Sequence, residues 1–307
     1  MNYSSDDLQR FLEIASEAAC AGGAVLQHYW GNLSNIRSKG RPGDLVTEAD
    51  KAAEKEVLAV LRRHVPSHAI LAEESGRLNE QLDEPSEEPL KGQIEERSEP
   101  TEKQTEKQAG RLLWAVDPLD GTTNYAHQYP FCGCSVGLLI DGQPAVGAIF
   151  DPVRSHLFRA ATGLGATCNR QPINVSNTEN LADSLLVTGF AYDRRETIDN
   201  NYAEFCHLTH LTRGVRRGGA ASIDLAYVAC GWLDGYWERG LSPWDLAAGV
   251  VLVEEAGGKV TAYDQKPFKI ESGRILATNS KIHAELSNVL GKIEPLAQFN
   301  PAKLNHS

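Results

Sequence analysis

The stretch WAVDPLDGTTNYAHQYPFCGCSVGLL, residues 114–139, places two carboxylates, Asp117 and Asp120, three positions apart after an apolar run. Pro118 and Gly121 interrupt regular structure, so a buried strand is expected to end here in a turn. Because Asp, Pro and Gly are ordinary turn residues, a turn without function is the simplest interpretation. Two carboxylates this close repel each other unless a cation lies between them, however. The stretch therefore also predicts a cation site whose other ligands lie elsewhere.

The composition is that of a soluble globular protein. The 307 residues are 41% apolar and 23% charged, which suits one large or two small packed domains. The formal charge of −11 argues against a nucleic-acid partner, which would need a basic face. No apolar run approaches the roughly 20 residues of a membrane span. Asp6 and Asp7 stand where a signal peptide carries positive charge, so a cytoplasmic protein without a membrane partner is expected.

Hydrophobic periodicity and turn residues predict helices and strands that alternate along the chain. Helices are expected over 5–29, 48–63, 197–211, 220–231 and 243–256, and strands over 69–72, 112–117, 131–140, 144–150, 156–160, 184–188, 234–238, 258–262 and 274–277. This alternation predicts a layered fold of the α/β or α+β class.

Residues 79–110 differ from the rest of the chain in composition. They hold ten acidic residues, four basic residues and three prolines, and no aromatic residue. Such a segment cannot bury enough apolar surface to pack a core. We therefore expect a disordered acidic insertion between two strands, and its simplest interpretation is a solvated loop without function.

Further carboxylates follow other predicted elements. Glu73 and Glu74 come directly after a short strand, and Asp245 lies in the first turn of a predicted helix. An all-oxygen group of this kind suits Mg²⁺, which binds through a few carboxylates and keeps several waters. After Asp120, residues 121–124 (GTTN) are expected to begin a short helix whose free N–H groups face an anion. A metal site beside such a helix end predicts a phosphate site, and two metal ions about 3.5–4 Å apart would make it hydrolytic.

Three other patterns are weaker. Residues 133–137 (GCSVG) match the G-x-S-x-G nucleophile motif, but the residues after them continue a strand where that motif requires a helix. Residues 163–165 (GLG) begin like a dinucleotide-binding loop but lack its third glycine and its helix, so a turn is expected. His207 and His210 share a helical face without a further ligand in sequence, so an ordinary surface or core role is expected.

Four motifs together resemble the inositol monophosphatase family of Mg²⁺-dependent, lithium-sensitive phosphatases. They are DLVTEAD (44–50), AEES (72–75), WAVDPLDGTTN (114–124) and W-E-x6-D (237–245). The resemblance covers about residues 5–293 apart from the insertion, as a single phosphatase domain of two α/β halves, about 5–190 and 191–293. It implies an α-β-α-β-α sandwich, and usually a homodimer.

The resemblance also implies metal ligands. Glu73, Asp117 and the backbone carbonyl of Leu119 would hold one Mg²⁺. Asp117 would bridge to a second ion, which Asp120 and Asp245 would also bind. Two or three ions per active site are expected on this basis.

Catalytic and substrate-binding roles are implied in the same way. The resemblance implies that water is activated near Glu73 and Thr122, and that Asp50 is hydrogen-bonded to Thr122. The remaining substrate contacts would come from the N–H groups of Gly121 and Thr122 for phosphate, and from Asp120, Ala221 and Glu238 for the alcohol. One position departs from the family pattern: its substrate-side glycine–threonine pair reads Gly219-Ala220 here, so a hydroxyl is missing.

The sequence thus predicts a Mg²⁺-dependent phosphomonoesterase for a small polyol phosphate, foremost an inositol monophosphate. Histidinol-phosphate phosphatase is the next alternative, followed by fructose-bisphosphatase and bisphosphate nucleotidase. A regulatory binding protein without catalysis is the alternative from another class. The complete set of predicted metal ligands favours the enzyme.

Overall fold

The computed structural model describes residues 3–40, 45–78 and 112–296. The predicted insertion over 79–110 lies outside the described residues, as does Asp44, the first residue of one motif. In the described part of the chain, no helix is both long and apolar enough to cross a membrane.

The first part of the chain forms two helices and a large sheet. The helices are α1 (Ser5–Tyr29) and α2 (Glu48–His64), with a small antiparallel pair, β1 (Ile36–Ser38) and β2 (Leu45–Thr47), between them in sequence. The large sheet has the order β10-β9-β8-β7-β6-β5-β3-β4. Its strands are β3 (Ala69–Ala72), β4 (Gly76–Leu78), β5 (Leu112–Asp120), β6 (Gly133–Ile140), β7 (Gln143–Asp151), β8 (His156–Ala161), β9 (Gly165–Cys168) and β10 (Gln171–Pro172). The short helix α3 (Thr122–Ala126) follows β5.

The second part builds a five-stranded sheet of order β12-β11-β13-β15-β14 and four helices. The strands are β11 (Leu185–Thr188), β12 (Gly214–Arg217), β13 (Gly235–Arg239), β14 (Lys259–Thr261) and β15 (Arg274–Thr278). The α-helices are α4 (Tyr202–Leu211), α5 (Ala221–Ala229), α6 (Pro243–Glu255) and α7 (His283–Leu290), and short 3-10 turns lie at Leu181–Asp183 and Ile270–Ser272.

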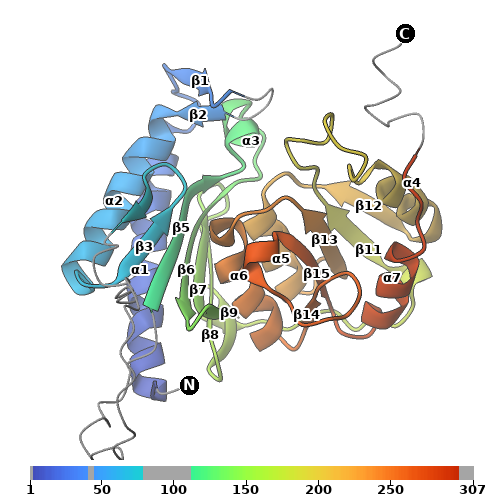
Figure 1. Cartoon of the computed structure of the whole chain (residues 1–307). Coiled ribbons are helices and arrows are strands. Elements are labelled where there is room, and N and C mark those ends of the chain that lie inside the picture. The colour runs from blue at the N-terminus through green and yellow to red at the C-terminus, as the bar shows by residue number, and fades with distance from the viewer. Residues whose placement is uncertain (1–2, 41–44, 79–111, 297–307) are drawn as a thin grey trace, which may run out of the picture.

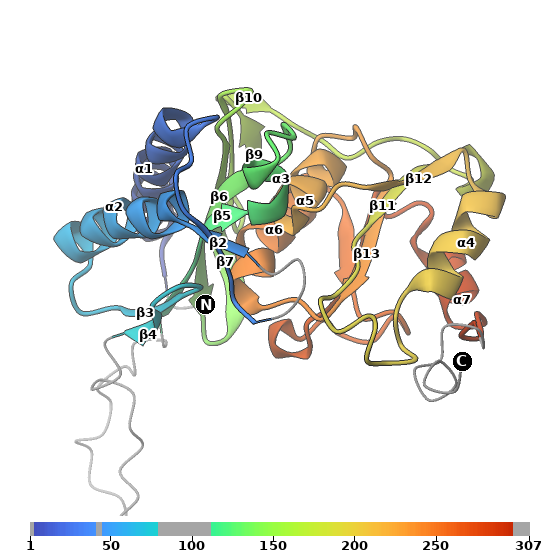
Figure 2. The same ribbon diagram turned by 90° about the horizontal axis from the view of Figure 1, so that it is seen from above.

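These elements stack in five layers, as Figures 1 and 2 show. α1 and α2 cover one face of the large sheet, α5 and α6 lie between the two sheets, and α4 and α7 lie outside the small sheet. Separate clusters of buried apolar side chains fill the spaces between the layers. The predicted α-β-α-β-α sandwich is therefore confirmed.

Two glycines let α6 approach the large sheet closely. A Cβ atom on Gly137 of β6 would lie 2.5 Å from the Cβ of Ala247, and one on Gly147 of β7 would lie 2.5 Å from the carbonyl oxygen of Ala248. Real Cβ atoms do not approach other atoms this closely, so any larger residue would push the helix away. This contact fixes the N-terminal end of α6, where Asp245 lies, against the strands of the large sheet.

Some predicted boundaries were wrong for identifiable reasons. Helix α4 begins at Tyr202 and not near 197, because Asn201 before it has a positive φ of 67°. The Asn201 amide donates to Thr188 Oγ1 and to the Gly189 carbonyl, which ties that segment to the small sheet. Strand β5 continues to Asp120, so the two aspartates lie within its irregular end and not in a turn after it; its pairing with β6 shifts between Asp117 and Asp120.

Candidate active site

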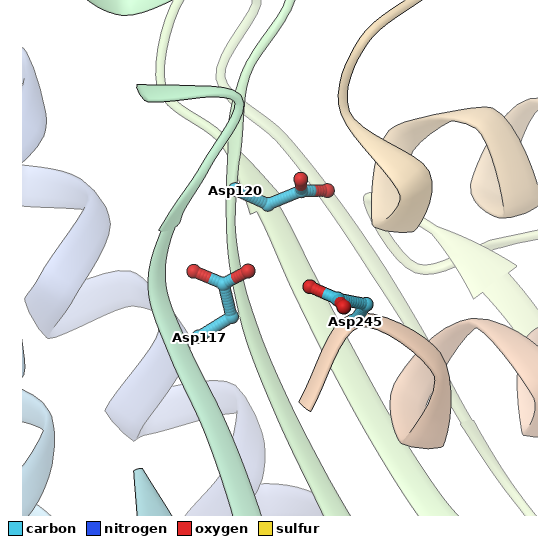
Figure 3. A group of neighbouring side chains, drawn as sticks. All are labelled: Asp117, Asp120 and Asp245. Carbon is cyan, nitrogen blue, oxygen red and sulfur yellow. The ribbon is translucent and has the colours of Figure 1, made fainter. Parts of the chain in front are cut away.

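Three carboxylates from two distant segments meet at the end of β5. Asp117, Asp120 and Asp245 each offer one oxygen, and these oxygens all lie within 4.8 Å of one another. Figure 3 shows the side chains of Asp117 and Asp120 on β5 beside that of Asp245 in the first turn of α6. Ser242 precedes that helix, and its backbone N–H donates to Asp245 Oδ2 at 2.6 Å, which fixes the side chain. This all-oxygen, highly charged group fits the donor preference of Mg²⁺.

The electrostatics of the three side chains also indicate a cation site. Asp117 and Asp120 are only 2% and 8% exposed. Burial, followed by the charges of Glu73, Asp120 and Asp245, raises the pKa of Asp117 well above its usual range. Burial and then the charge of Asp120 raise the pKa of Asp245 well above its usual range as well. The protein alone therefore penalises the ionised forms, and a bound divalent cation would favour them.

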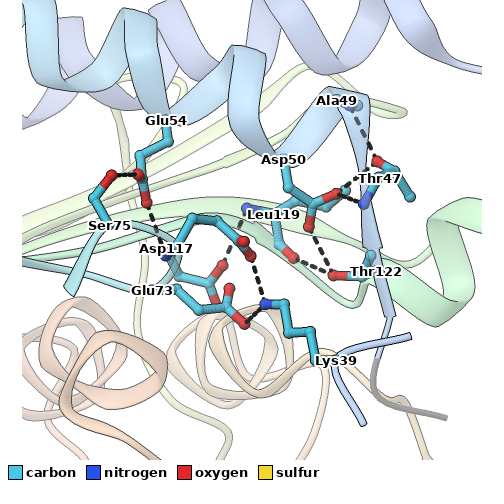
Figure 4. A network of polar contacts seen from close by, with 11 residues as sticks. Lys39, Thr47, Ala49, Asp50, Glu54, Glu73, Ser75, Asp117, Leu119 and Thr122 are labelled. Carbon is cyan, nitrogen blue, oxygen red and sulfur yellow. Dashed lines mark hydrogen bonds and ion pairs between the residues drawn. The ribbon is translucent and has the colours of Figure 1, made fainter. Parts of the chain in front are cut away.

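Glu73 reaches the same place because β3 and β5 are parallel. Ala72 pairs with Val116, so Glu73 and Asp117 follow neighbouring positions at the same edge of the sheet. Glu73 Oε1 accepts from Lys39 Nζ at 2.8 Å, and Glu74 forms a second ion pair with the same ammonium. Figure 4 shows this network. Burial raises the pKa of Glu73 even though Lys39 opposes the shift.

The turn that carries Glu73 is held by a buried acid that sequence reasoning missed. Glu54 accepts the backbone N–H of Glu74 at 2.9 Å and the hydroxyl of Ser75. It lies four residues after Asp50 on α2, so the two acids share one helix face that also carries the buried Ala53. The four-residue spacing of two acids on an otherwise apolar face of α2 was the sequence signal that could have identified Glu54.

Asp50 and Thr122 are hydrogen-bonded, as predicted. Thr122 Oγ1 lies 3.1 Å from Asp50 Oδ1 and 3.1 Å from the Leu119 carbonyl oxygen. The other oxygen of Asp50 accepts from the backbone N–H of Thr47 at 2.8 Å and from its hydroxyl, which also caps α2. Burial raises the pKa of Asp50 to about 6. The N–H of Leu119 donates to Asp117 Oδ1 at 3.0 Å, which links this network to the carboxylates (Figure 4).

Gly121 lies between the carboxylate group and the segments that carry Phe131 and Ala220. Its φ of 86° is left-handed, and a Cβ there would lie 3.0 Å from the Phe131 carbonyl oxygen and 3.1 Å from the Cβ of Ala220. Only glycine meets both demands at low cost. Asn124 fixes the same loops, because its amide donates to the carbonyls of Phe131 and Gly218 at 2.8 and 3.0 Å.

The remaining predicted residues surround the same cavity. One pocket of about 420 Å³ is lined by every predicted metal and substrate residue, and also by Gly189 and Tyr192. Asp50 is not among its lining residues.

Glu238 accepts from Tyr236 Oη at 2.6 Å, and burial raises the pKa of Glu238 to about 7. Sequence reasoning missed Ser222, whose N–H and hydroxyl donate to Asp120 Oδ2 at 2.7 and 2.6 Å.

The three weaker patterns carry no such arrangement. Residues 133–137 lie inside the continuous strand β6, so the nucleophile motif lacks the turn that it needs. Residues 163 and 164 lie in the turn before β9, which begins at Gly165, and the N–H groups of Gly163 and Gly165 donate to Glu255. His207 and His210 are exposed on α4.

The missing hydroxyl at Ala220 leads to a stability prediction. Ala220 is the N-cap of α5 and offers no side-chain cap. We expect Ala220→Ser to raise the free energy of unfolding by about 1 kcal/mol, because a serine oxygen can accept an N–H of the first turn. Urea unfolding of the metal-free protein measures this change. The control is Ala220→Cys, whose side chain is close to that of serine in shape and should give no comparable gain. Equal effects of the two variants would contradict the capping explanation.

The buried carboxyls predict a pH-dependent effect of Mg²⁺ on stability. Because their pKa values are raised in the folded state, the folded metal-free protein binds protons more tightly than the unfolded chain. Their contribution to the free energy of unfolding therefore falls as the pH rises from about 4 through about 7. Bound Mg²⁺ would relieve this penalty, so the increase in Tm caused by MgCl2 over EDTA should grow between about pH 5 and about pH 8. An increase that is equal at both pH values would contradict a buried carboxylate metal site.

Comparisons with known proteins agree with this geometry. A family model described as the inositol monophosphatase family matches residues 7–294. An inositol-1-monophosphatase from Synechocystis sp. is 57% identical over 94% of this chain and 91% of that protein. The Nus factor SuhB of Pseudomonas aeruginosa is 38% identical over 89% of this chain and 93% of its own. The solved inositol monophosphatase from Anabaena (Nostoc) sp. PCC 7120 is 57% identical, with a TM-score of 0.78 over 95% of this chain and 99% of that one.

Proposed function

This chain belongs to the inositol monophosphatase family and is a phosphoric monoester hydrolase, and from that premise we propose that it hydrolyses myo-inositol monophosphate to myo-inositol and phosphate. The observation that carries the proposal is the convergence of Asp117, Asp120 and Asp245 beside Glu73 in one pocket. The 57% identity to an inositol-1-monophosphatase supports the choice of substrate.

We propose that Mg²⁺ is the cofactor, with two or three ions per site. Glu73, Asp117 and the Leu119 carbonyl would hold one ion, and Asp117, Asp120 and Asp245 a second. When bound, two such ions lower the pKa of water and stabilise the attacking and leaving oxygens. The donor set supports this assignment because it contains only oxygen atoms and places several carboxyls in a buried position.

The protein residues would orient the reactants. Thr122 and Glu73 would flank the attacking water, and Asp50 would hold the Thr122 hydroxyl in place through their hydrogen bond. The backbone N–H groups of Gly121 and Thr122 would bind the phosphate oxygens. Asp120, Ala221 and Glu238 would contact the hydroxyls of the polyol, and their shared pocket would hold the substrate in a reactive orientation.

The same family resemblance extends the proposal to properties of the whole protein. A homodimer, a cytoplasmic location and inhibition by lithium would follow from it. The relatives named Nus factor SuhB raise the alternative of a regulatory binding protein. The carboxylate group of this chain is complete, however, and a purely regulatory protein would have no need of it.

A substrate screen tests the proposal. Phosphate release would be measured from myo-inositol 1-phosphate, histidinol phosphate, fructose 1,6-bisphosphate and adenosine 3′,5′-bisphosphate, each with MgCl2 or EDTA. We expect turnover of myo-inositol 1-phosphate that requires Mg²⁺. Absence of Mg²⁺-dependent phosphate release from all four compounds would contradict the proposed activity.

A further inference from the structure

The carboxylate of Glu238 is held on two sides where it reaches the active-site pocket. Glu238 lies on β13, lines the pocket and is 8% exposed. Tyr236 precedes it by two positions on the same strand, so both side chains lie on one face of the sheet. The Tyr236 side chain is fully buried, and its hydroxyl donates to Glu238 Oε2 at 2.6 Å. One carboxylate oxygen is therefore fixed from inside the core.

Gly189 closes the other side of the carboxylate. Thr188 at the end of β11 pairs with Trp237 of the parallel strand β13. The residues that follow them, Gly189 and Glu238, lie so close that a Cβ on the glycine would be 2.1 Å from Oε2 and 2.2 Å from Oε1. The φ of Gly189 is outside the left-handed region, so the backbone itself does not require glycine here. Glycine is instead needed to make room for the carboxylate.

Asn201 keeps Gly189 in place. Its side-chain amide donates to the Gly189 carbonyl at 2.7 Å and to Thr188 Oγ1 at 2.8 Å. Its side-chain oxygen accepts from the indole N–H of Trp237, the neighbour of Glu238 on β13, at 2.7 Å. Asn201 is 5% exposed, so water competes little for these hydrogen bonds. Asn201 thus joins the end of β11 to β13 and fixes Gly189 relative to Glu238.

A carboxylate fixed in this way selects a hydrogen-bond donor. Above its pKa of about 7, Glu238 is ionised and only accepts hydrogen bonds, and a hydroxyl of a polyol can donate one. A mobile glutamate would lose rotamer entropy on binding, whereas this side chain is already ordered. A site built for a hydroxyl also discriminates against a ligand that lacks it, because the polar group of the protein is then left unpaired. The arrangement therefore favours a phosphate ester whose alcohol carries a further hydroxyl.

We propose that Tyr236 and Gly189 are positioning residues, which hold Glu238 toward one ring hydroxyl and make this enzyme selective for polyol phosphates over phosphate esters without hydroxyls. The inference rests on the proposed phosphatase function and on the proposed contact of Glu238 with the polyol. Both residues act through Glu238 and not on the reacting atoms. We therefore expect them to affect the choice of substrate and not the chemical step.

The test compares a polyol phosphate with an ester that has no hydroxyl. The value of kcat/KM is measured for myo-inositol 1-phosphate and for p-nitrophenyl phosphate, at a pH where Glu238 is ionised and at equal free Mg²⁺ and ionic strength. We expect Tyr236→Phe and Gly189→Ala each to lower kcat/KM for the inositol ester by about tenfold, the scale of one hydrogen bond to a charged group. The loss should lie mainly in KM, because the hydroxyl contact exists in both the bound substrate and the transition state. Both variants should hydrolyse p-nitrophenyl phosphate at nearly the wild-type rate; if its turnover is too slow, its Ki as a competitive inhibitor replaces kcat/KM.

A double-mutant cycle decides whether the two residues act through Glu238. In the Glu238→Ala background, Tyr236→Phe and Gly189→Ala should cause no further loss on the inositol ester, because the carboxylate that they position is gone. Tyr125→Phe is the matched control. Its hydroxyl is also buried and donates to the Leu26 carbonyl, but Tyr125 is absent from the pocket lining. This control should keep both kcat/KM values.

The outcomes separate this inference from the proposed function. Unchanged substrate preference in both variants, or equal losses on both esters, would overturn the positioning role and leave the phosphatase function standing. Further losses in the Glu238→Ala background would also overturn it, because the residues would then act independently of that carboxylate. A wild type without Mg²⁺-dependent hydrolysis of the inositol ester would overturn the proposed function as well. Thermal unfolding shows whether either variant misfolds, and the other variant then decides.

Discussion

Replacing Asp117 by Asn is expected to reduce kcat by about a thousandfold or more while the protein stays folded. Asp117 is the carboxylate proposed to contact both cations, and the electrostatic stabilisation that such ions supply amounts to several kcal/mol. In the metal-free protein the side chain is 2% exposed and lies among Glu73, Asp120 and Asp245. Removing its charge relieves repulsion of about 1 kcal/mol, so the metal-free variant should be as stable as the wild type or slightly more stable.

The variant separates loss of chemistry from loss of structure. Initial rates at saturating MgCl2 give the catalytic effect, and urea unfolding in EDTA gives the free energy of unfolding. Asp264→Asn is the control, because Asp264 is an exposed acid paired with Lys266 on the surface. Activity of the Asp117 variant within tenfold of wild type would exclude a two-metal site at this position.

The sequence predicted the positions that depend on local signals. Ser242 and Pro243 mark the start of α6 in the sequence itself, so Asp245 was correctly placed in a first turn. Apolar periodicity located α1, and Thr47 as the N-cap located α2. The short strands β1 and β12 were missed, because each has three or four residues and lacks an alternating burial pattern.

The parts of the site that were missed depend on contacts between distant segments. Ser222 donates to Asp120 across 102 positions, and Lys39 pairs with Glu73 across 34. No spacing rule connects such pairs, because the tertiary arrangement of α5 and of the segment after β1 decides them. The carboxylates themselves could be found from their places at the ends of predicted elements and from the motif resemblance, whereas the residues that orient them required the fold.

Replacing Asp245 by Asn is expected to raise the Mg²⁺ concentration needed for half-maximal activity by about tenfold or more, the scale seen when a metal site loses a supporting contact. Asp245 uses Oδ2 to accept the Ser242 N–H, and its other oxygen is available to the carboxylate group. An asparagine carbonyl can keep the Ser242 bond, so α6 should retain its start. The amide NH2 would then face Asp117 and Asp120, where a donor cannot bind a cation.

Lithium gives this variant a second readout. Li⁺ is close to Mg²⁺ in size but carries half its charge, so the same oxygens can bind it without giving the same stabilisation. We expect inhibition of the wild type that is uncompetitive with substrate, and Asp245→Asn should raise the inhibitory LiCl concentration together with the Mg²⁺ requirement. The measurements are initial rates at several LiCl concentrations, with KCl matching the ionic strength, and the rise in Tm with MgCl2 in the absence of substrate.

A variant that needs more Mg²⁺ but keeps its lithium sensitivity would show that Li⁺ binds elsewhere. A wild type in which lithium only competes with substrate would mean that Li⁺ does not act at a cation site formed by Asp117, Asp120 and Asp245.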